Sequence, residues 1–225
     1  MVLPLMFLVH LTLFVFVESL TQVPFATLYS GKYCDSDSIT TEGMYESSLR
    51  TIGWDEKAHS VKMLGTWIFY ERESFNSFEE GQTIHFIGDN DICINSTTLQ
   101  LAGQISSIRY AGLPWSYKDD AINIYEVEDF QGDEIKSEKD LPFVASQFQA
   151  SLIITGCSAW TFYDRPSYHG KPVCINATED GQPVLTSISG ELKENKVLEP
   201  MCILRQIKIS SLFHFCTRSK TGVCE

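Results

Sequence analysis

Residues 160–170 read WTFYDRPSYHG, and the order of residue types in this stretch recurs along the chain. Apolar and polar residues alternate up to a Tyr, an acid follows, and an aromatic residue stands five positions after the Tyr. A Gly comes two positions later. Such alternation indicates a half-buried β-strand, and Gly takes the positive φ that a sharp hairpin needs. The stretch therefore predicts a strand that runs into a tightly folded hairpin.

Two other segments repeat this order clearly. Residues 67–75 read WIFYERESF, residues 122–132 read INIYEVEDFQG, and a faint copy opens at Tyr29. Tyr29 precedes Tyr125 by 96 residues and Tyr70 precedes Tyr163 by 93, so the chain divides into two similar halves. The motif residues that we expect to shape the hairpins are Tyr70, Phe75, Tyr125, Phe130, Gly132, Tyr163, Tyr168 and Gly170.

A second recurring element follows each copy, a Ser that opens an apolar run. A hydroxyl in this place can hydrogen-bond back to the hairpin and satisfy its amides. We assign this structural role to Ser107, Ser151 and Ser211, and Ser60 opens the corresponding run of the first copy.

Short alternating runs separated by Asn, Asp, Gly and Ser favour many short strands joined by turns. Long helical periodicity is scarce, and only Glu191–Leu198 could form a short helix. A unit of about forty residues holds roughly four strands, the size of one Greek key, and two such units can bury a common core. We therefore expect an all-β protein with two β-sandwich domains of two units each.

The pattern Tyr-Glu-x-x-x-Phe-x-Gly, followed later by Ser-Ile-Arg, resembles the Greek-key motif of the βγ-crystallin family. Residues 160–170 match it best, and the resemblance extends over residues 25–215. It implies two βγ-crystallin-like domains with four Greek keys. The first two copies depart from the motif, because Ser36 and Ser77 stand at the Gly position.

The expected organisation begins with a cleaved signal peptide. Residues 2–17 are almost wholly apolar and too few for a comfortable membrane span; a signal anchor is the alternative. In the linker we expect Trp115 to pack on its own domain, although exposed aromatics there could pair domains or chains. The expected parts are a signal peptide (1–19), an N-terminal domain (20–113), a linker (114–120), a C-terminal domain (121–215) and a tail with cysteines (216–225).

Cysteines and glycosylation sequons agree with a secreted, extracellular location. An oxidising compartment converts most thiols into disulfides, and an odd number leaves one free or paired between chains. The seven candidates are Cys34, Cys93, Cys157, Cys174, Cys202, Cys216 and Cys224, and their connectivity stays open. Asn95 and Asn176 each begin an N-x-T sequon and are expected to carry glycans.

Calcium is the ligand that the family resemblance implies. Many βγ-crystallins bind Ca²⁺ through two adjacent Asn or Asp residues followed, after two spacers, by two hydroxyl residues. Residues 55–60 read DEKAHS, which makes Asp55, Glu56 and Ser60 the candidate oxygen ligands. The corresponding stretches 102–107, 146–151 and 206–211 lack the acids. We therefore expect no cofactor other than a degenerate Ca²⁺ site at Asp55; otherwise these Ser residues are structural.

No motif in the sequence carries a catalytic mechanism. A Gly-x-Ser-x-Gly elbow is missing, and Glu pairs two residues apart on a strand are commonly a polar face. The net charge of −12 disfavours nucleic acid as a partner. We expect a protein that is not an enzyme.

The function that we expect is that of a secreted structural or binding protein. Its partner would be an extracellular protein or glycan, with no membrane span and with a monomer or dimer as the assembly. The alternatives are a Ca²⁺-binding extracellular module and a secreted defence factor such as a protease inhibitor or toxin component.

Overall fold

The computed structural model describes residues 23–42, 45–145, 151–175, 178, 182–187 and 211–213. The strands of the N-terminal half are β1 (Phe25–Tyr29), β2 (Ser38–Glu42), β3 (Ser60–Tyr70), β4 (Thr83–Ile94) and β5 (Ser107–Ala111). Those of the C-terminal half are β6 (Ala121–Tyr125), β7 (Glu134–Ser137), β8 (Ser151–Thr155), β9 (Trp160–Arg165), β10 (His169–Ile175), β11 (Val184–Ser187) and β12 (Ser211–Phe213). Three short 3-10 turns interrupt them: η1 (Leu49–Ile52), η2 (Glu73–Asn76) and η3 (Glu128–Phe130). The all-β prediction is confirmed.

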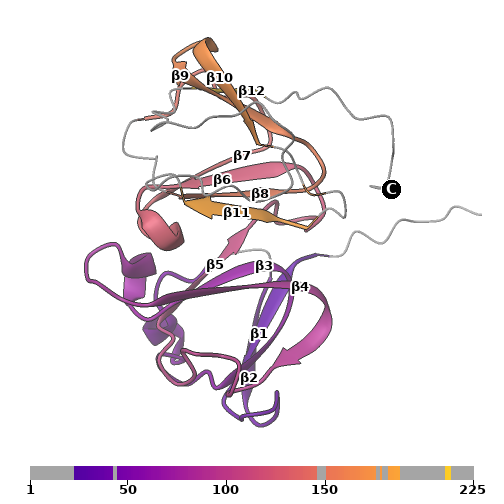
Figure 1. Ribbon diagram of the computed structural model, residues 1–225. Helices are drawn as coiled ribbons and strands as arrows, with labels where there is room; N and C mark the ends of the chain where they lie inside the picture. The colour runs from indigo at the N-terminus through magenta and orange to yellow at the C-terminus, as the bar shows by residue number, and fades with distance from the viewer. Residues whose placement is uncertain are drawn as a thin grey trace, which may run out of the picture.

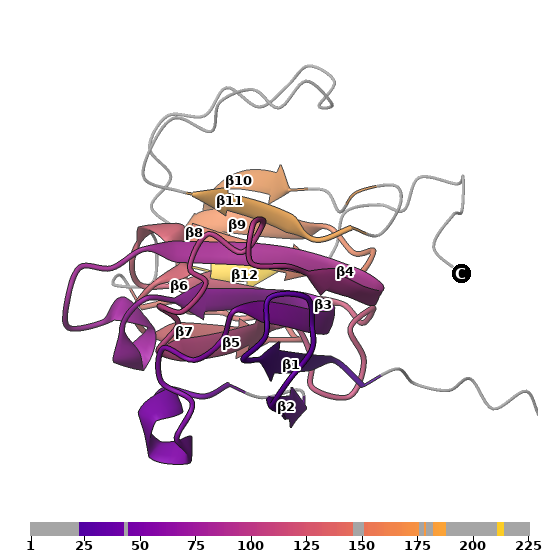
Figure 2. The same cartoon turned by 90° about the horizontal axis from the view of Figure 1, so that it is seen from below.

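All the strand pairs are antiparallel. In the N-terminal half the order is β2-β1-β3-β4, with β5 also paired to β3. In the C-terminal half one sheet has the order β11-β8-β6-β7 and the other β10-β9-β12. Strand β11 follows β10 in sequence yet joins the sheet of β6 and β8, as a Greek-key connection requires. Figure 1 shows the two halves as stacked bodies, and Figure 2 views them along the stack.

Strand β3 passes from one layer of its half to the other. Residues 60–64 pair with β1, whereas residues 66–70 pair with β5. The register with β4 shifts between Met63 and Gly65. Gly88 of β4 is the partner of Gly65, and a Cβ on Gly88 would lie 2.5 Å from the Met63 carbonyl oxygen. Strands β3 and β4 can therefore approach this closely only because residue 88 is a glycine.

Each half has a core of its own. Trp67 and Phe69 lie fully buried in the first, and Trp160 and Phe162 are the largest side chains in the second. These tryptophans open the second unit of each half, so the paired repeat of the sequence corresponds to paired positions in the two cores. The expected domain boundaries at residues 113 and 121 stay a prediction.

Two expectations about burial are wrong. Alternating strands were expected to be half-buried, but β5, β6 and β8 are buried at every position, because their outer faces pack against the other half of the chain. Trp115 was expected to pack on its own domain, yet 52% of its surface is exposed, while Tyr117 packs against the N-terminal core. Among the residues described, no helix has the length and apolar character needed to cross a membrane.

Candidate functional site

The hairpin that follows β1 is the part of the molecule where the repeated motif is chemically altered. The Ser30 N–H donates to the Asp37 carbonyl at 2.9 Å, and the Gly31 N–H donates to the Asp35 carbonyl at 3.1 Å. Cys34 and Ser36 take φ values of 56° and 70°. A non-glycine residue in this region carries a strain that surrounding bonds must offset.

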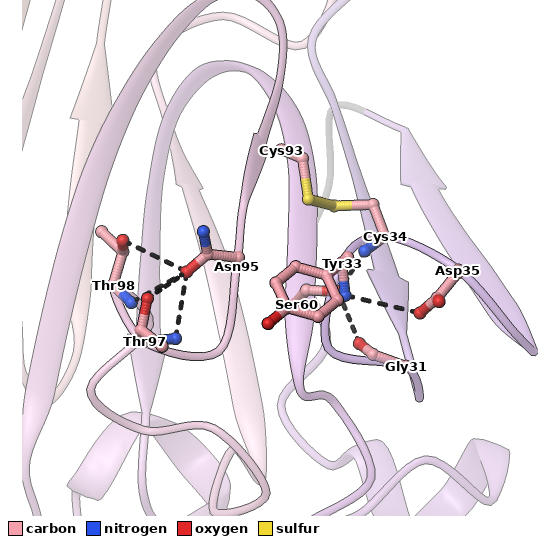
Figure 3. The surroundings of a disulfide bond; sticks show 9 residues. All are labelled: Gly31, Tyr33, Cys34, Asp35, Ser60, Cys93, Asn95, Thr97 and Thr98. Carbon is pink, nitrogen blue, oxygen red and sulfur yellow. Dashed lines mark hydrogen bonds between the residues drawn. A yellow bond between two sulfur atoms is a disulfide. The ribbon is translucent and has the colours of Figure 1, made fainter.

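Ser60 supplies those bonds. The Cys34 N–H donates to the Ser60 hydroxyl at 2.7 Å, and that hydroxyl donates to the Gly31 carbonyl at 2.6 Å. Figure 3 shows Ser60 lying across the hairpin from which Cys34 projects. Both polar roles of the hydroxyl are therefore engaged with the backbone of one bend.

The same arrangement recurs in the second and third hairpins. Ser107 accepts from the Phe75 N–H at 3.1 Å and donates to the Arg72 carbonyl at 2.6 Å. Ser151 accepts from the Phe130 N–H at 2.9 Å and donates to the Val127 carbonyl at 2.7 Å. In these three hairpins the repeated Ser thus bridges the residues two and five positions after the repeated Tyr. The side chain of Ser211, the fourth member, lies outside the described residues.

Aromatic pairs cover three of the four hairpins. The ring centroids of Tyr70 and Phe75 lie 5.5 Å apart, and those of Tyr125 and Phe130 lie 5.6 Å apart. The fourth hairpin has the pair Tyr163 and Tyr168 at 6.1 Å. All three are edge-on contacts, the arrangement that aromatic quadrupoles favour.

In the first hairpin the place of the second aromatic is taken by Cys34. This residue is disulfide-bonded to Cys93 of β4, with a Cα–Cα distance of 5.9 Å and a sequence separation of 59 (Figure 3). The N–H of Cys34 makes the same bond as the N–H of Phe75 and Phe130. The disulfide therefore replaces the aromatic cover and leaves the hydrogen-bond frame unchanged. Our sequence reasoning missed this pairing, although Cys34 stands five positions after Tyr29, where the other copies have an aromatic.

The other cysteines and the sequons divide between described and undescribed parts of the chain. Cys157 and Cys174 are disulfide-bonded too, whereas Cys202, Cys216 and Cys224 lie outside the described residues, as does Asn176. Asn95 lies in the turn after β4, two residues beyond Cys93. Its amide oxygen accepts the Thr97 hydroxyl at 2.6 Å and the Thr97 N–H at 3.0 Å (Figure 3).

The positive φ expected at the Gly position occurs in three copies. Gly132 and Gly170 have φ of 75° and 89°, and Ser36 has 70°. Ser77, in the second copy, has φ of −67° instead, because Ser74, Phe75 and Asn76 before it already turn the chain with positive φ. The second hairpin therefore folds without a positive φ at this position.

The calcium candidates are engaged in other contacts. Asp55 pairs with Arg50 at 3.0 Å, so a cation already lies against that carboxylate. Ser60 binds the first hairpin through both of its roles. Glu56 sits in the same turn at a φ of 54°. In the described part of the chain no three His, Cys, Asp or Glu residues gather as a metal site would require. These residues do not fit Ca²⁺ as they are placed.

Tyr70 and Tyr125, the repeated tyrosines of the second and third hairpins, lie fully buried where the two halves meet. Burial raises the pKa of Tyr70, and the Arg109 guanidinium opposes this shift. Burial and then the nearby Glu134 carboxylate raise the pKa of Tyr125. Both hydroxyls are therefore kept protonated; that of Tyr70 donates to the Phe130 carbonyl, and both rings pack in the same buried cluster.

Comparison with known proteins agrees with this architecture. The Beta/Gamma crystallin family profile matches residues 121–182. Gamma-crystallin S of Canis lupus familiaris is 28% identical over 134 residues, which is 53% of this chain and 66% of that protein. Gamma-crystallin S of Bos taurus is 27% identical over 172 residues, 69% of this chain and 82% of its own length. The canine alignment thus spans slightly less than two thirds of that relative.

A solved structure extends the match to the fold. Geodin, a βγ-crystallin from Geodia cydonium, superposes with a TM-score of 0.61 at 16% identity, covering 86% of this chain and all of Geodin. The family profile lies on the third hairpin and the strands that follow it, where Tyr125, Phe130 and Ser151 form the repeated frame. Residues 121–182 thus resemble the βγ-crystallin family, and the chain has the fold of a βγ-crystallin.

Proposed function

We propose that this chain is a secreted, non-enzymatic structural or binding protein with two βγ-crystallin domains, residues 20–113 and 121–215. Its partners would be proteins or glycans at extracellular surfaces. The observation that carries the proposal is the Cys34–Cys93 disulfide in the place of an aromatic contact. Structural disulfides persist in oxidising compartments and are rare in the cytosol. A hairpin that depends on one therefore suits a protein made for the outside of the cell.

The engaged serines support a structural role. The hydroxyls of Ser60, Ser107 and Ser151 each accept one backbone N–H and donate to one backbone carbonyl. A nucleophilic Ser needs an adjacent base that takes its proton. Here the proton of each hydroxyl is directed at a carbonyl of the hairpin, so we assign these residues to the fold.

N-linked glycosylation at Asn95 is part of the proposal. The amide oxygen of Asn95 faces Thr97 and Thr98, which leaves the amide nitrogen as the atom that a glycan would join. The turn follows the strand that carries Cys93, so sugar and disulfide would lie on neighbouring parts of one surface. Sugars attached there would add a soluble, bulky group.

The test is expression of the full chain in cultured eukaryotic cells. We expect the protein in the medium, without residues 1–19, with Cys34 and Cys93 recovered in one cross-linked peptide. Peptide N-glycosidase should lower its mass, and Asn95→Gln should remove part of that shift. Asn90→Gln, at an Asn outside any sequon, is the matched control for the substitution itself. Retention inside the cells with free thiols would refute the proposal.

Calcium binding is tested on the same material. Ligands that bind only the folded state raise the melting temperature by mass action. Because Asp55 already pairs with Arg50 at 3.0 Å, we expect millimolar CaCl₂ to leave the melting temperature unchanged. A rise that Asp55→Asn abolishes would favour the calcium-module alternative instead.

A further inference from the structure

The outer faces of two sheets meet between the N-terminal and C-terminal halves. One face comes from β3 and β5, and the other from β6 and β8 with the turn η3. Together they bury a cluster of side chains, which we call the interface cluster: Ile68, Tyr70, Ala111, Tyr125, Phe130 and Ile153. In Figure 1 strand β5 lies next to the sheet of the C-terminal half.

Directional bonds connect the second and third hairpins across this interface. The Tyr70 hydroxyl donates to the Phe130 carbonyl at 2.5 Å. The Gly132 N–H donates to the Phe75 carbonyl at 3.2 Å, and Arg109 donates to the Gly132 carbonyl at 2.9 Å. The two hairpins that share the Tyr–Phe–Ser frame thus bind one another, so the interface has a defined register.

Charges lie inside the same interface. The Arg109 side chain is 3% exposed, stacks 3.6 Å from the centroid of the Phe75 ring and lies 3.8 Å from the Glu134 carboxylate, which is 10% exposed. Lys136 donates to the Tyr110 carbonyl at 3.2 Å. Burial lowers the pKa of Lys136, Glu134 opposes that shift and Arg109 adds to it. Among the described residues, Glu134 is the carboxylate that faces both cations.

The groups around Glu134 determine what its protonation does. Arg109 approaches from β5, Lys136 from β7, and the tyrosine hydroxyls of Tyr70 and Tyr125 act on it from β3 and β6. Asn123 of β6 donates to it as well. With Glu134 neutral, two cations remain in a buried interface without a counter-charge. Removing one partner of a buried pair is strongly destabilising, because the other charge stays desolvated.

We propose that the interface between the two halves is an acid-sensitive latch, in which protonation of Glu134 releases the two sheet faces while each core stays folded. The cores do not depend on these charges, since Trp67 and Trp160 lie in separate apolar clusters.

His85 of β4 acts in the same direction at the rim of the interface. Its ring lies 5.4 Å from that of Phe130, edge-on. Burial lowers the pKa of His85, and Asp129 of η3 opposes this shift. A histidine with a lowered pKa in the closed state takes up its proton more readily when the halves part, so acid favours parting.

The experiment is hydrogen exchange and small-angle scattering on the oxidised full chain, from neutral pH down to about pH 2. After correction for the slower intrinsic exchange in acid, we expect the protection factors of residues 72–76 and 127–132 to fall about tenfold, while β1 and β9 keep theirs. The radius of gyration should increase reversibly. Unchanged exchange in the two hairpins, or loss of protection in the cores together with them, would overturn the proposal.

Variants separate Glu134 from the other acids. Glu134→Gln should open the interface at neutral pH, whereas Glu138→Gln, an exposed acid just beyond β7, should behave as the wild type. Replacing Arg109 and Lys136 by Met together with Glu134→Gln removes the charges and should keep the halves closed in acid. A closed Glu134→Gln at neutral pH, or a charge-free variant that still opens in acid, would contradict the role of Glu134.

Discussion

The first hairpin and the third differ in what covers them, although the same hydrogen bonds fold both. In the third, Phe130 lies over Tyr125 and its N–H reaches Ser151. In the first, Cys34 makes the equivalent bond to Ser60 but is covered through a disulfide to Cys93. The comparison shows that the hydrogen bonds that fold a hairpin and the group that packs over it can vary independently. The Ser bridge defines the bend, and either an aromatic ring or a covalent cross-link can hold it in place.

Breaking the cross-link should have the largest effect. The disulfide joins residues 59 apart, for which the loss of chain entropy in the unfolded state is worth about 4 kcal/mol. Cys34→Ala with Cys93→Ala should lower the free energy of unfolding by about that amount in urea denaturation. A reducing agent should then add no further loss from this pair. An unchanged transition midpoint would contradict the assignment of the cystine as the cover of the first hairpin.

Removing the aromatic cover of the third hairpin should come next. Phe130 is buried against Tyr125 and His85, so Phe130→Ala should cost about 3 kcal/mol through lost burial and a cavity. Calorimetric melting is the measurement. Phe78→Ala is the matched control, because Phe78 is 87% exposed and should leave the melting temperature almost unchanged. Equal decreases in melting temperature for the two variants would mean that Phe130 does not stabilise the third hairpin.

The Ser bridges should differ between the two hairpins by a smaller amount. Ser151→Ala leaves the buried Phe130 N–H without its partner and should cost about 2 kcal/mol. Ser60→Ala should cost about 1 kcal/mol, because Gly31 and Cys34 are partly exposed to water. Urea denaturation of both variants checks the difference, with the exposed Ser38→Ala as control. The reverse order would show that the disulfide makes the first hairpin more dependent on its Ser.

Alkaline pH should weaken the interface cluster and leave the first hairpin intact. Burial raises the folded-state pKa of Tyr70 and Tyr125 above the ordinary value. The unfolded chain therefore loses these protons first, and stability is lost as pH rises beyond about 10, by about 1 kcal/mol per tyrosine at pH 10.5. Melting curves between pH 8 and 10.5 measure this, and Tyr70→Phe should reduce the slope. A pH-independent melting temperature in this range would contradict the burial argument.

The sequence predicts the hairpins well because their determinants are local. Tyr125, Phe130 and Ser151 lie within one repeat, and their roles follow from spacing and residue type. The expectation of a positive φ at the Gly position of the motif was less general, since Ser77 has an ordinary negative φ there. There the turn is made by the three residues before it.

Features that depend on packing between distant parts were not predictable in the same way. The burial of Arg109 and Glu134 follows from two sheet faces meeting, and no spacing in the chain encodes that contact. The expectation that Trp115 packs on its own domain failed for the converse reason. A large apolar residue suggests burial, but in the segment between the halves about half of its surface is exposed. The place of Cys34 could have been inferred from alignment of the faint first copy with the others.

The disulfide of the first hairpin also constrains the order of events during synthesis of the chain. Cys93 follows Cys34 by 59 residues, so at about 5–20 residues per second it is synthesised roughly 3–12 s later. In a chain exported as we propose, Cys34 is an open thiol during that interval, and Ser60, which bridges its bend, is synthesised after Cys34 and before Cys93. Asn95 emerges only two residues after Cys93, so oxidation of the thiol and attachment of sugar compete within the same moments of synthesis.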